Sequence, residues 1–212
     1  MGRKVNPKGF RLGKFYTWDS RWFADKKRYR DLLLEDQKIR DALMAKLRQA
    51  GIAKVEIERS INTLDVTLNV SRPGMVIGRG GQGLEDLKRY VEDIIKKQKA
   101  TSATKVELHV EPVKEPNLEA QLIASMIADQ LVRRMPYKRV IAQTMEKVMG
   151  SQARGVKIIL AGRIAGAEIA RRERYQQGAV PLSTLREKID FARVAALTKS
   201  GFIGVKVWIC RP

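Results

Sequence analysis

The spacing of apolar residues changes along the chain between the helical period of about 3.6 and the strand period of two, which predicts a mixed fold of helices and strands. From Glu35 to Gly51 apolar side chains recur about every fourth position, as in an amphipathic helix that a glycine ends. Two alternating runs follow, and Ile61-Asn62-Thr63 between them is short enough to make them a hairpin. The elements expected in this half are a helix over 35–51, strands over 54–59 and 64–70, a short apolar turn over 75–77, a helix over 84–97 and a strand over 106–110.

A polar segment with two prolines, residues 111–116, is the best candidate for a domain boundary. Apolar positions at helical spacing resume after it, and Pro136 divides them because proline disfavours a helical residue before it and suits the start of a new helix. The Gly- and Arg-rich segment 162–185 has no clear period. The elements expected in this half are helices over 118–134 and 136–149 and strands over 156–160 and 203–209.

The charge of the chain indicates a partner that is a polyanion. The 212 residues include 42 Lys and Arg against 23 Asp and Glu, a formal charge of +19, and nucleic acid is the usual partner of such a chain. A single His and a single Cys exclude a zinc finger, a His-based triad and a disulfide framework within the chain. No apolar run approaches the ~18 residues of a membrane span, and no secretory signal opens the sequence. We therefore expect a soluble, intracellular protein with no membrane partner.

The glycine-rich loop after residue 77 fits two unrelated patterns. Gly78-x-Gly80-x-x-Gly83 is the spacing of a dinucleotide-binding loop, which would make the protein a nucleotide-dependent enzyme. That loop directly follows a buried parallel strand, and an acidic residue comes about 20 residues later. Here the preceding strand is only half apolar, and residues 101–104 contain no acid. The context therefore disfavours the enzyme, and we expect no cofactor, no metal and no catalytic residue.

The second pattern is Ile77-Gly78-x-x-Gly81-x-x-Leu84 between two helices, which resembles the GXXG loop of KH domains. Glycines there let an RNA backbone approach peptide amides at a helix N-terminus, where negative charge is favoured. The element order helix–strand–strand–helix–helix–strand is that of the type II KH fold. The alternatives are a turn that binds nothing and a free-standing KH regulator. The loop residues expected to bind RNA are Gly78, Arg79, Gly80 and Gly81.

Further segments along the whole chain resemble the small-subunit ribosomal protein three family of bacterial or organellar type. They keep the order of the family and extend far beyond the glycine motif. The segments that carry the resemblance are residues 2–13 (GRKVNPKGFRLG), 72–78 (RPGMVIG), 162–171 (GRIAGAEIAR), 180–186 (VPLSTLR) and 204–209 (GVKVWI).

The resemblance implies a non-enzymatic, structural constituent of the head of the small ribosomal subunit, which binds ribosomal RNA and lines the entry channel for messenger RNA. It implies contacts with the tenth and fourteenth proteins of that subunit, with the second nearby. The protein would be ribosome-bound in the cytoplasm, meaning the bacterial cytosol, or an organelle matrix. The fold class expected is α/β (α+β), with a basic N-terminal arm over 1–34, a type II KH domain over 35–111 and a C-terminal domain of two helices on a small sheet over 112–212.

Two groups of basic residues are candidates for RNA contact, and ordinary solvated surface charge is the alternative for each. Four cations within seven residues, at the junction of the two C-terminal helices, are assigned by the resemblance to the message entry channel: Arg133, Arg134, Lys138 and Arg139. Those expected to bind ribosomal RNA are Arg3, Lys4, Lys8, Arg11, Arg163, Arg171, Arg172 and Arg174.

Overall fold

The computed structural model describes residues 4–60, 62–98 and 105–212, which form two compact units. Trp18–Lys114 form one unit, and Glu115–Pro212 form the other together with the N-terminal stretch up to Thr17. Each unit has a sheet of its own and a hydrophobic core of its own. No helix in the described parts of the chain is long and apolar enough to cross a bilayer.

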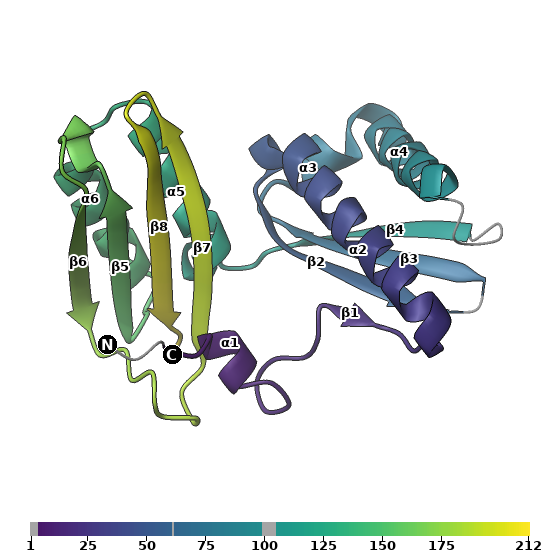
Figure 1. Ribbon diagram of the computed structural model, residues 1–212, viewed down its shortest axis with the longest axis horizontal. Coiled ribbons are helices and arrows are strands. Elements are labelled where there is room, and N and C mark those ends of the chain that lie inside the picture. Colours follow the sequence, from purple (N-terminus) through teal and green to yellow (C-terminus); the bar gives the residue numbers. More distant parts are fainter. Residues whose placement is uncertain (1–3, 61, 99–104) are drawn as a thin grey trace. The chain divides into compact units, whose positions relative to one another are not determined.

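The unit formed by Trp18–Lys114 has the strand and helix order of a type II KH domain (Figure 1). Its sheet order is β1-β2-β3-β4, with β2 and β3 antiparallel and β3 and β4 parallel. A two-residue strand pairs in parallel with β2 at the edge of this sheet. The elements are β1 (Ser20–Arg21), α2 (Lys26–Lys46), β2 (Ile52–Arg59), β3 (Thr63–Val70), α3 (Pro73–Ile77), α4 (Gln82–Gln98) and β4 (Lys105–Pro112), with short 3-10 turns at Arg48–Ala50 and Arg79–Gly81.

Alternation along β3 gives this unit its core, because every second side chain of a strand points to the same face. Leu64, Val66, Leu68 and Val70 are fully buried, whereas the residues between them are half-buried. Helices α2 and α4 cover the buried face with their own apolar residues, Ile39 and Leu43 from α2 and Leu87, Val91 and Ile95 from α4.

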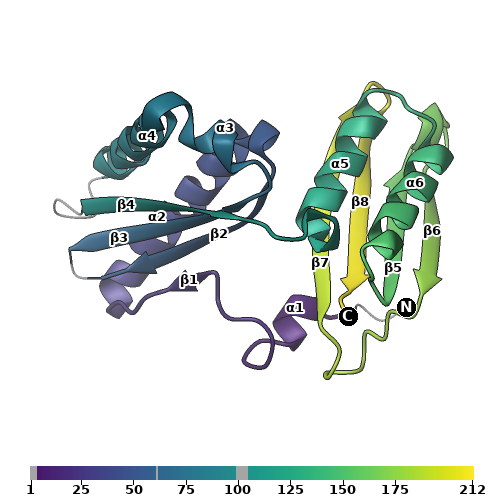
Figure 2. The same ribbon diagram turned by 180° about the vertical axis from the view of Figure 1, so that it is seen from behind.

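The second unit places two helices on one face of a four-stranded antiparallel sheet (Figure 2). The sheet order is β6-β5-β8-β7, so β5 and β8 are central and β6 and β7 are edges. The elements are α1 (Pro7–Phe10), α5 (Ala120–Val132), α6 (Tyr137–Gly150), β5 (Gly155–Gly162), β6 (Arg171–Gly178), β7 (Ile189–Thr198) and β8 (Gly201–Cys210), with 3-10 turns at Pro116–Leu118 and Ile164–Gly166.

The two faces of the C-terminal sheet differ in character. Val156, Ile158 and Leu160 of β5 pack into the core beneath α5 and α6. The intervening Lys157 and Ile159 therefore point to the opposite face, which faces the viewer in Figure 1. We name this surface the open face of the C-terminal sheet, since neither helix covers it.

The structure confirms the predicted fold class and the order of elements in the KH unit, and it corrects several boundaries. Helix α2 begins at Lys26 rather than at Glu35. The apolar pattern did not reveal its first turns, because they are exposed and carry no apolar stripe. Where a stripe would begin, the helix instead buries Glu35 and Asp36. Arg59 Nη1 donates to Glu35 at 3.1 Å and Arg59 Nε donates to Asp36 at 2.8 Å, so a buried ion-pair cluster precedes the apolar residues Ile39 and Leu43 along the helix.

The N-terminal residues and the C-terminal sheet also differ from the expectation. The proposed arm over 1–34 is divided, since residues up to Thr17 belong to the C-terminal unit and the rest to the KH unit. Glu111 and Pro112 end β4, and the change of unit falls after Lys114. Strands β6 and β7 have no counterpart in the predicted elements, because β6 is an edge strand of almost entirely polar residues.

Candidate nucleic-acid interface

Glycines allow α3 and α4 to approach each other at the GXXG loop. Gly78 has φ +71° and ψ −174°, a region of backbone space that only glycine adopts readily. A Cβ on Gly78 would lie 3.0 Å from the backbone nitrogen of Gly83, and a Cβ on Gly83 would lie 2.7 Å from the carbonyl oxygen of Val76. These two glycines therefore fix the turn itself. Gly83 was outside the predicted binding set, although its place in the motif was visible in the sequence.

The other two glycines of the loop leave its outer side open. Gly80 and Gly81 have φ of +60° and +83°, and no atom lies within 4 Å of a Cβ built on either. Arg79 between them and Gly78 is exposed. A phosphate backbone can therefore approach the peptide groups closely, with a guanidinium beside them and the N-terminus of α4 directly following.

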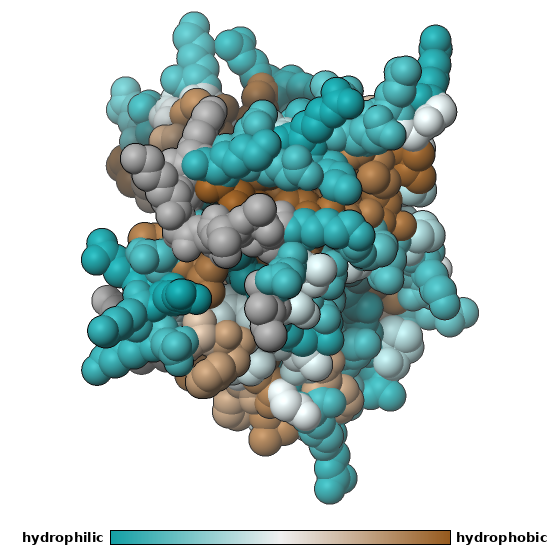
Figure 3. All heavy atoms as spheres, turned by 90° about the vertical axis from the view of Figure 1, so that its right-hand side faces the viewer, coloured by the Kyte–Doolittle hydropathy of each residue, from teal (hydrophilic) through white to brown (hydrophobic). Residues whose placement is uncertain are grey.

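The surroundings of the loop exclude a dinucleotide site and leave apolar side chains exposed beside it. The loop joins two helices, and α3 separates it from β3, so it does not directly follow a strand. Met75 and Ile77 of α3 are exposed beside it, with 51% and 40% of their surfaces accessible. On the face shown in Figure 3, hydrophilic side chains project around exposed hydrophobic patches.

The junction between α5 and α6 holds its basic residues in a fixed turn. The N–H of Arg134 donates to Leu131 at 3.0 Å and that of Met135 donates to Gln130 at 3.2 Å, which is the Schellman pattern of a helix end. Arg134 occupies the left-handed position of this motif with φ 59°, where glycine is usual. Lys138 and Arg139 follow in the first turn of α6, which contains no acid. All four basic residues of this junction are exposed, and we name them the junction cations: Arg133, Arg134, Lys138 and Arg139.

Replacing Arg134 with glycine is expected to raise the free energy of unfolding by about 0.5–1 kcal/mol, because a left-handed conformation costs an L-residue more than it costs glycine. Urea unfolding followed by circular dichroism measures this change. The neighbouring Arg133 has φ −74°, so Arg133→Gly is the matched control and is expected to lower stability. Equal effects of the two substitutions would contradict the strain at Arg134.

Comparison with known proteins fits both units. Residues 38–118 match the KH domain model, and residues 127–209 match that of the ribosomal protein S3 C-terminal domain. "Small ribosomal subunit protein uS3" of Carboxydothermus hydrogenoformans is 47% identical over 209 residues, which cover 99% of this chain and 91% of the relative. The protein of the same name from Desulforudis audaxviator is 45% identical over 211 residues, covering 100% and 94%. The chain belongs to the uS3 family of small-subunit ribosomal proteins. This family is structural and non-enzymatic, and its KH domain is an RNA-binding module.

The structure corrects the expectation that Arg11 binds RNA. Arg11 is only 1% exposed, and its guanidinium donates hydrogen bonds within the protein. It donates to five backbone carbonyl oxygens, those of Glu187 at 2.8 Å, Pro7 at 3.1 Å, Pro181 at 3.3 Å, Leu182 at 3.0 Å and Thr184 at 2.9 Å. Arg11 is therefore a structural clamp between α1 and the loop before β7.

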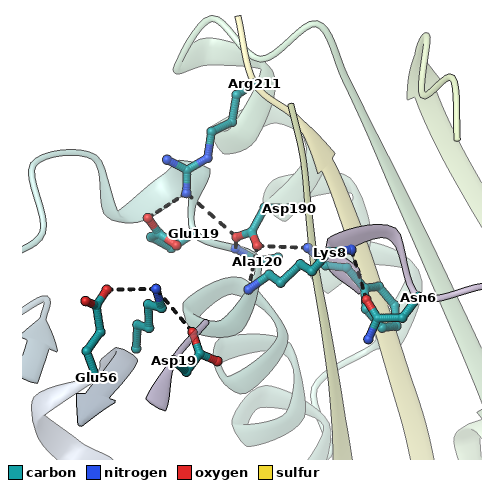
Figure 4. Close-up of polar contacts among 10 residues, drawn as sticks. Asn6, Lys8, Asp19, Glu56, Glu119, Ala120, Asp190 and Arg211 are labelled. Atoms are coloured by element: carbon teal, nitrogen blue, oxygen red, sulfur yellow. Dashed lines mark hydrogen bonds and ion pairs between the residues drawn. The ribbon is translucent and has the colours of Figure 1, made fainter. Parts of the chain in front are cut away.

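Lys8 is also engaged within the protein (Figure 4). Its Nζ lies 2.8 Å from Asp190, whose other carboxylate oxygen accepts the N–H of Ala120 at 2.7 Å. Burial alone would raise the pKa of Asp190, but Lys8, this N–H and Arg211 together lower it. Lys8 remains partly exposed, with 40% of its side chain accessible. Lys4 is exposed, and Arg3 lies outside the described residues.

The four arginines predicted to form a C-terminal cluster are separated by the strand geometry. Arg163 follows β5 and donates to the carbonyl oxygens of Ala167 and Ser200. Arg171 contacts Glu173 at 2.6 Å and the Tyr137 hydroxyl at 3.2 Å. Only two of the four, Arg172 and Arg174, point to the open face of the C-terminal sheet, as their pairing with Ala161 and Ile159 requires. All four are exposed.

Three further cations reach the open face and were missed as candidates: Lys157, Arg193 and Lys206. The sequence contained a signal for two of them, because Lys157 lies between Val156 and Ile158 and Lys206 lies between Val205 and Val207. A charged residue inside an alternating strand points away from the buried face. Arg193 lies in β7, which the apolar pattern did not reveal.

The His of the chain lies in a small cluster on the KH sheet. Ligand atoms of Asp65, Glu107 and His109 lie within 4.8 Å of one another across β3 and β4. Lys105 Nζ occupies Glu107 at 2.7 Å, and His109 is exposed. The geometry of this cluster therefore does not indicate a metal site.

Proposed function

We propose that the chain is a structural constituent of the head of the small ribosomal subunit, where it binds ribosomal RNA and lines the entry channel for messenger RNA. Membership of the uS3 family supports the ribosomal role. The observation that carries the message contact is the set of four exposed junction cations on one fixed helical turn. Lys138 and Arg139 lie in the first turn of α6 and oppose its dipole, so their positions are unfavourable until an anion arrives, whereas Arg133 and Arg134 end α5, where the dipole favours cations.

The two units divide the proposed RNA contacts between them. In the KH unit Gly78, Arg79, Gly80 and Gly81 take the backbone of ribosomal RNA, because the open glycines allow close approach and Arg79 adds a charge. In the C-terminal unit the remaining ribosomal RNA contacts come from Lys4, Lys8, Arg163, Arg171, Arg172 and Arg174. Ribosome-bound neighbours are the tenth and fourteenth small-subunit proteins, with the second nearby.

The junction cations act on the message by charge alone. The phosphates of a single RNA strand are accessible along its backbone, and a short basic turn can bind them as the strand passes. Holding a strand that has separated from a hairpin hinders its pairing again, which helps to open hairpins in the incoming message. No bond is made or broken, so this role needs no catalytic residue.

Replacing all four junction cations with alanine is expected to leave subunit assembly intact and to slow translation of hairpin-containing messages about threefold to tenfold, because phosphate contacts are lost. Reconstituted translation of paired messages, with and without a hairpin at the entry side, measures the effect. A charge-preserving variant with Arg133→Lys, Arg134→Lys, Lys138→Arg and Arg139→Lys is the matched control. Equal rates on both messages in the alanine variant would remove the entry-channel role while leaving the ribosomal one.

A further inference from the structure

The open face of the C-terminal sheet carries an unbalanced row of positive charge. Pairing in register places Arg174, Ile159, Lys206 and Arg193 side by side across β6, β5, β8 and β7. Lys206 and Arg193 are direct cross-strand partners, and like charges in that position repel. No acid occupies the next rows on this face either, where Arg172, Ala161, Gly204 and Ala195 align and Gln176, Lys157, Trp208 and Phe191 align.

Lys157 is the most unusual residue of this face. It is only 5% exposed, and among the described residues no carboxylate, carbonyl or hydroxyl oxygen accepts from its Nζ. The ammonium instead lies 5.1 Å from the ring centroid of Trp208. Burial, with Arg174, Lys4 and Arg172 nearby, lowers the pKa of Lys157. Removing a cation from water is unfavourable unless an anion compensates it, and no carboxylate of the described residues pairs with the Nζ of Lys157.

A cavity of about 490 Å³ opens onto Lys157. Lys4 and Arg174 also line it, so three cations converge on one space, and no described acid contributes to its walls. Apolar side chains, those of Phe10, Val180 and Leu182, complete the lining. The volume falls within the ~300–1,000 Å³ of pockets that take small molecules, so the space exceeds what a lone ion needs.

We propose that this cavity is a binding site for one nucleotide unit of ribosomal RNA, with its phosphate on Lys157, Arg174 and Lys4 and its sugar or base against the apolar wall. The proposal rests on the proposed ribosomal function and adds a site to it. Three cations with no acid match a phosphodiester, and the apolar wall offers the contact that a free anion would not use. The surrounding row of Arg193 and Lys206 supplies contacts for adjoining phosphates.

The test measures the affinity of the full chain for transcribed small-subunit ribosomal RNA at several salt concentrations. Lys157→Met keeps the length of the side chain and removes its charge, so it is expected to bind about tenfold more weakly and to reduce the salt slope by about 0.7–0.9. Lys157→Arg is expected to stay within about twofold of the unmodified chain. Lys147→Met is the matched control, because Lys147 is exposed on α6, away from the open face.

Folding is controlled by urea unfolding, in which Lys157→Met is expected to be at least as stable as the unmodified chain because it removes an uncompensated charge. A second variant, Lys4→Gln with Arg174→Gln, changes only exposed residues of the cavity and is also expected to weaken binding. Unchanged affinity and salt slope in both variants overturn the site, including the case in which a carboxylate of a neighbouring protein fills it. Failure of the unmodified chain to bind the RNA would overturn the proposed function itself.

Discussion

Replacing Arg11 with methionine is expected to lower the free energy of unfolding of the C-terminal unit by about 3–5 kcal/mol, a large loss of stability for a single substitution. The physical reason is the number of groups that depend on one guanidinium. Its five hydrogen bonds hold α1 against the loop before β7, and the substitution removes the donor from one buried and four partly buried carbonyl contacts. Urea unfolding followed by circular dichroism measures the loss.

Arg186→Met provides the control, because Arg186 is an exposed arginine of the same loop. We expect it to change stability by less than about 0.5 kcal/mol. At a temperature where Arg11→Met remains folded, its affinity for ribosomal RNA is expected to match that of the unmodified chain, since a side chain only 1% exposed cannot reach the RNA. Unchanged stability with weaker RNA binding would restore the role first expected for Arg11.

The KH unit was predictable because its elements follow local rules. Strand β3 alternates strictly, β2 alternates after a bulge near Ile52, and few residues separate the two strands, so their pairing followed from the pattern. The loop from Gly78 to Gly83 was recognisable in the sequence because its backbone requires glycine at several positions. The resemblance along the whole chain then identified the family, which the comparisons confirm.

Features that depend on tertiary contacts were not predictable from the same patterns. Helix α2 begins at Lys26, before its apolar residues, and it buries Glu35 and Asp36 through ion pairs with Arg59, which leave no apolar period in the sequence. Strand β6 is held by its ladder to β5 rather than by buried side chains. The sequence around a basic residue likewise does not predict whether its side chain is exposed, as that of Arg134 is, or enclosed by carbonyl oxygens, as that of Arg11 is.

The largest loss of RNA affinity is expected from aspartate at both Arg79 and Gly80, about 100-fold at moderate salt, because like charges juxtaposed in an interface cost several kcal/mol. The substitution reverses the charge of the loop where the phosphate backbone would lie. Filter binding of the full chain to small-subunit ribosomal RNA across a salt series measures the loss. The fold tolerates the change, since no atom lies within 4 Å of a Cβ on Gly80 and aspartate accepts its left-handed φ of +60° better than most residues.

Asparagine at the same two positions separates charge from backbone strain. Arg79→Asn with Gly80→Asn places side chains of nearly the same size in the same conformation but adds no negative charge. Its affinity is expected to fall only about threefold to tenfold, from loss of the Arg79 contact. Equal weakening by the two pairs would mean that glycine conformation, rather than charge at the phosphate cradle, governs the loop. Full affinity in the folded aspartate pair would instead make the loop a turn between α3 and α4 that RNA does not touch, and the binding of RNA would then rest on the basic surfaces of the C-terminal unit.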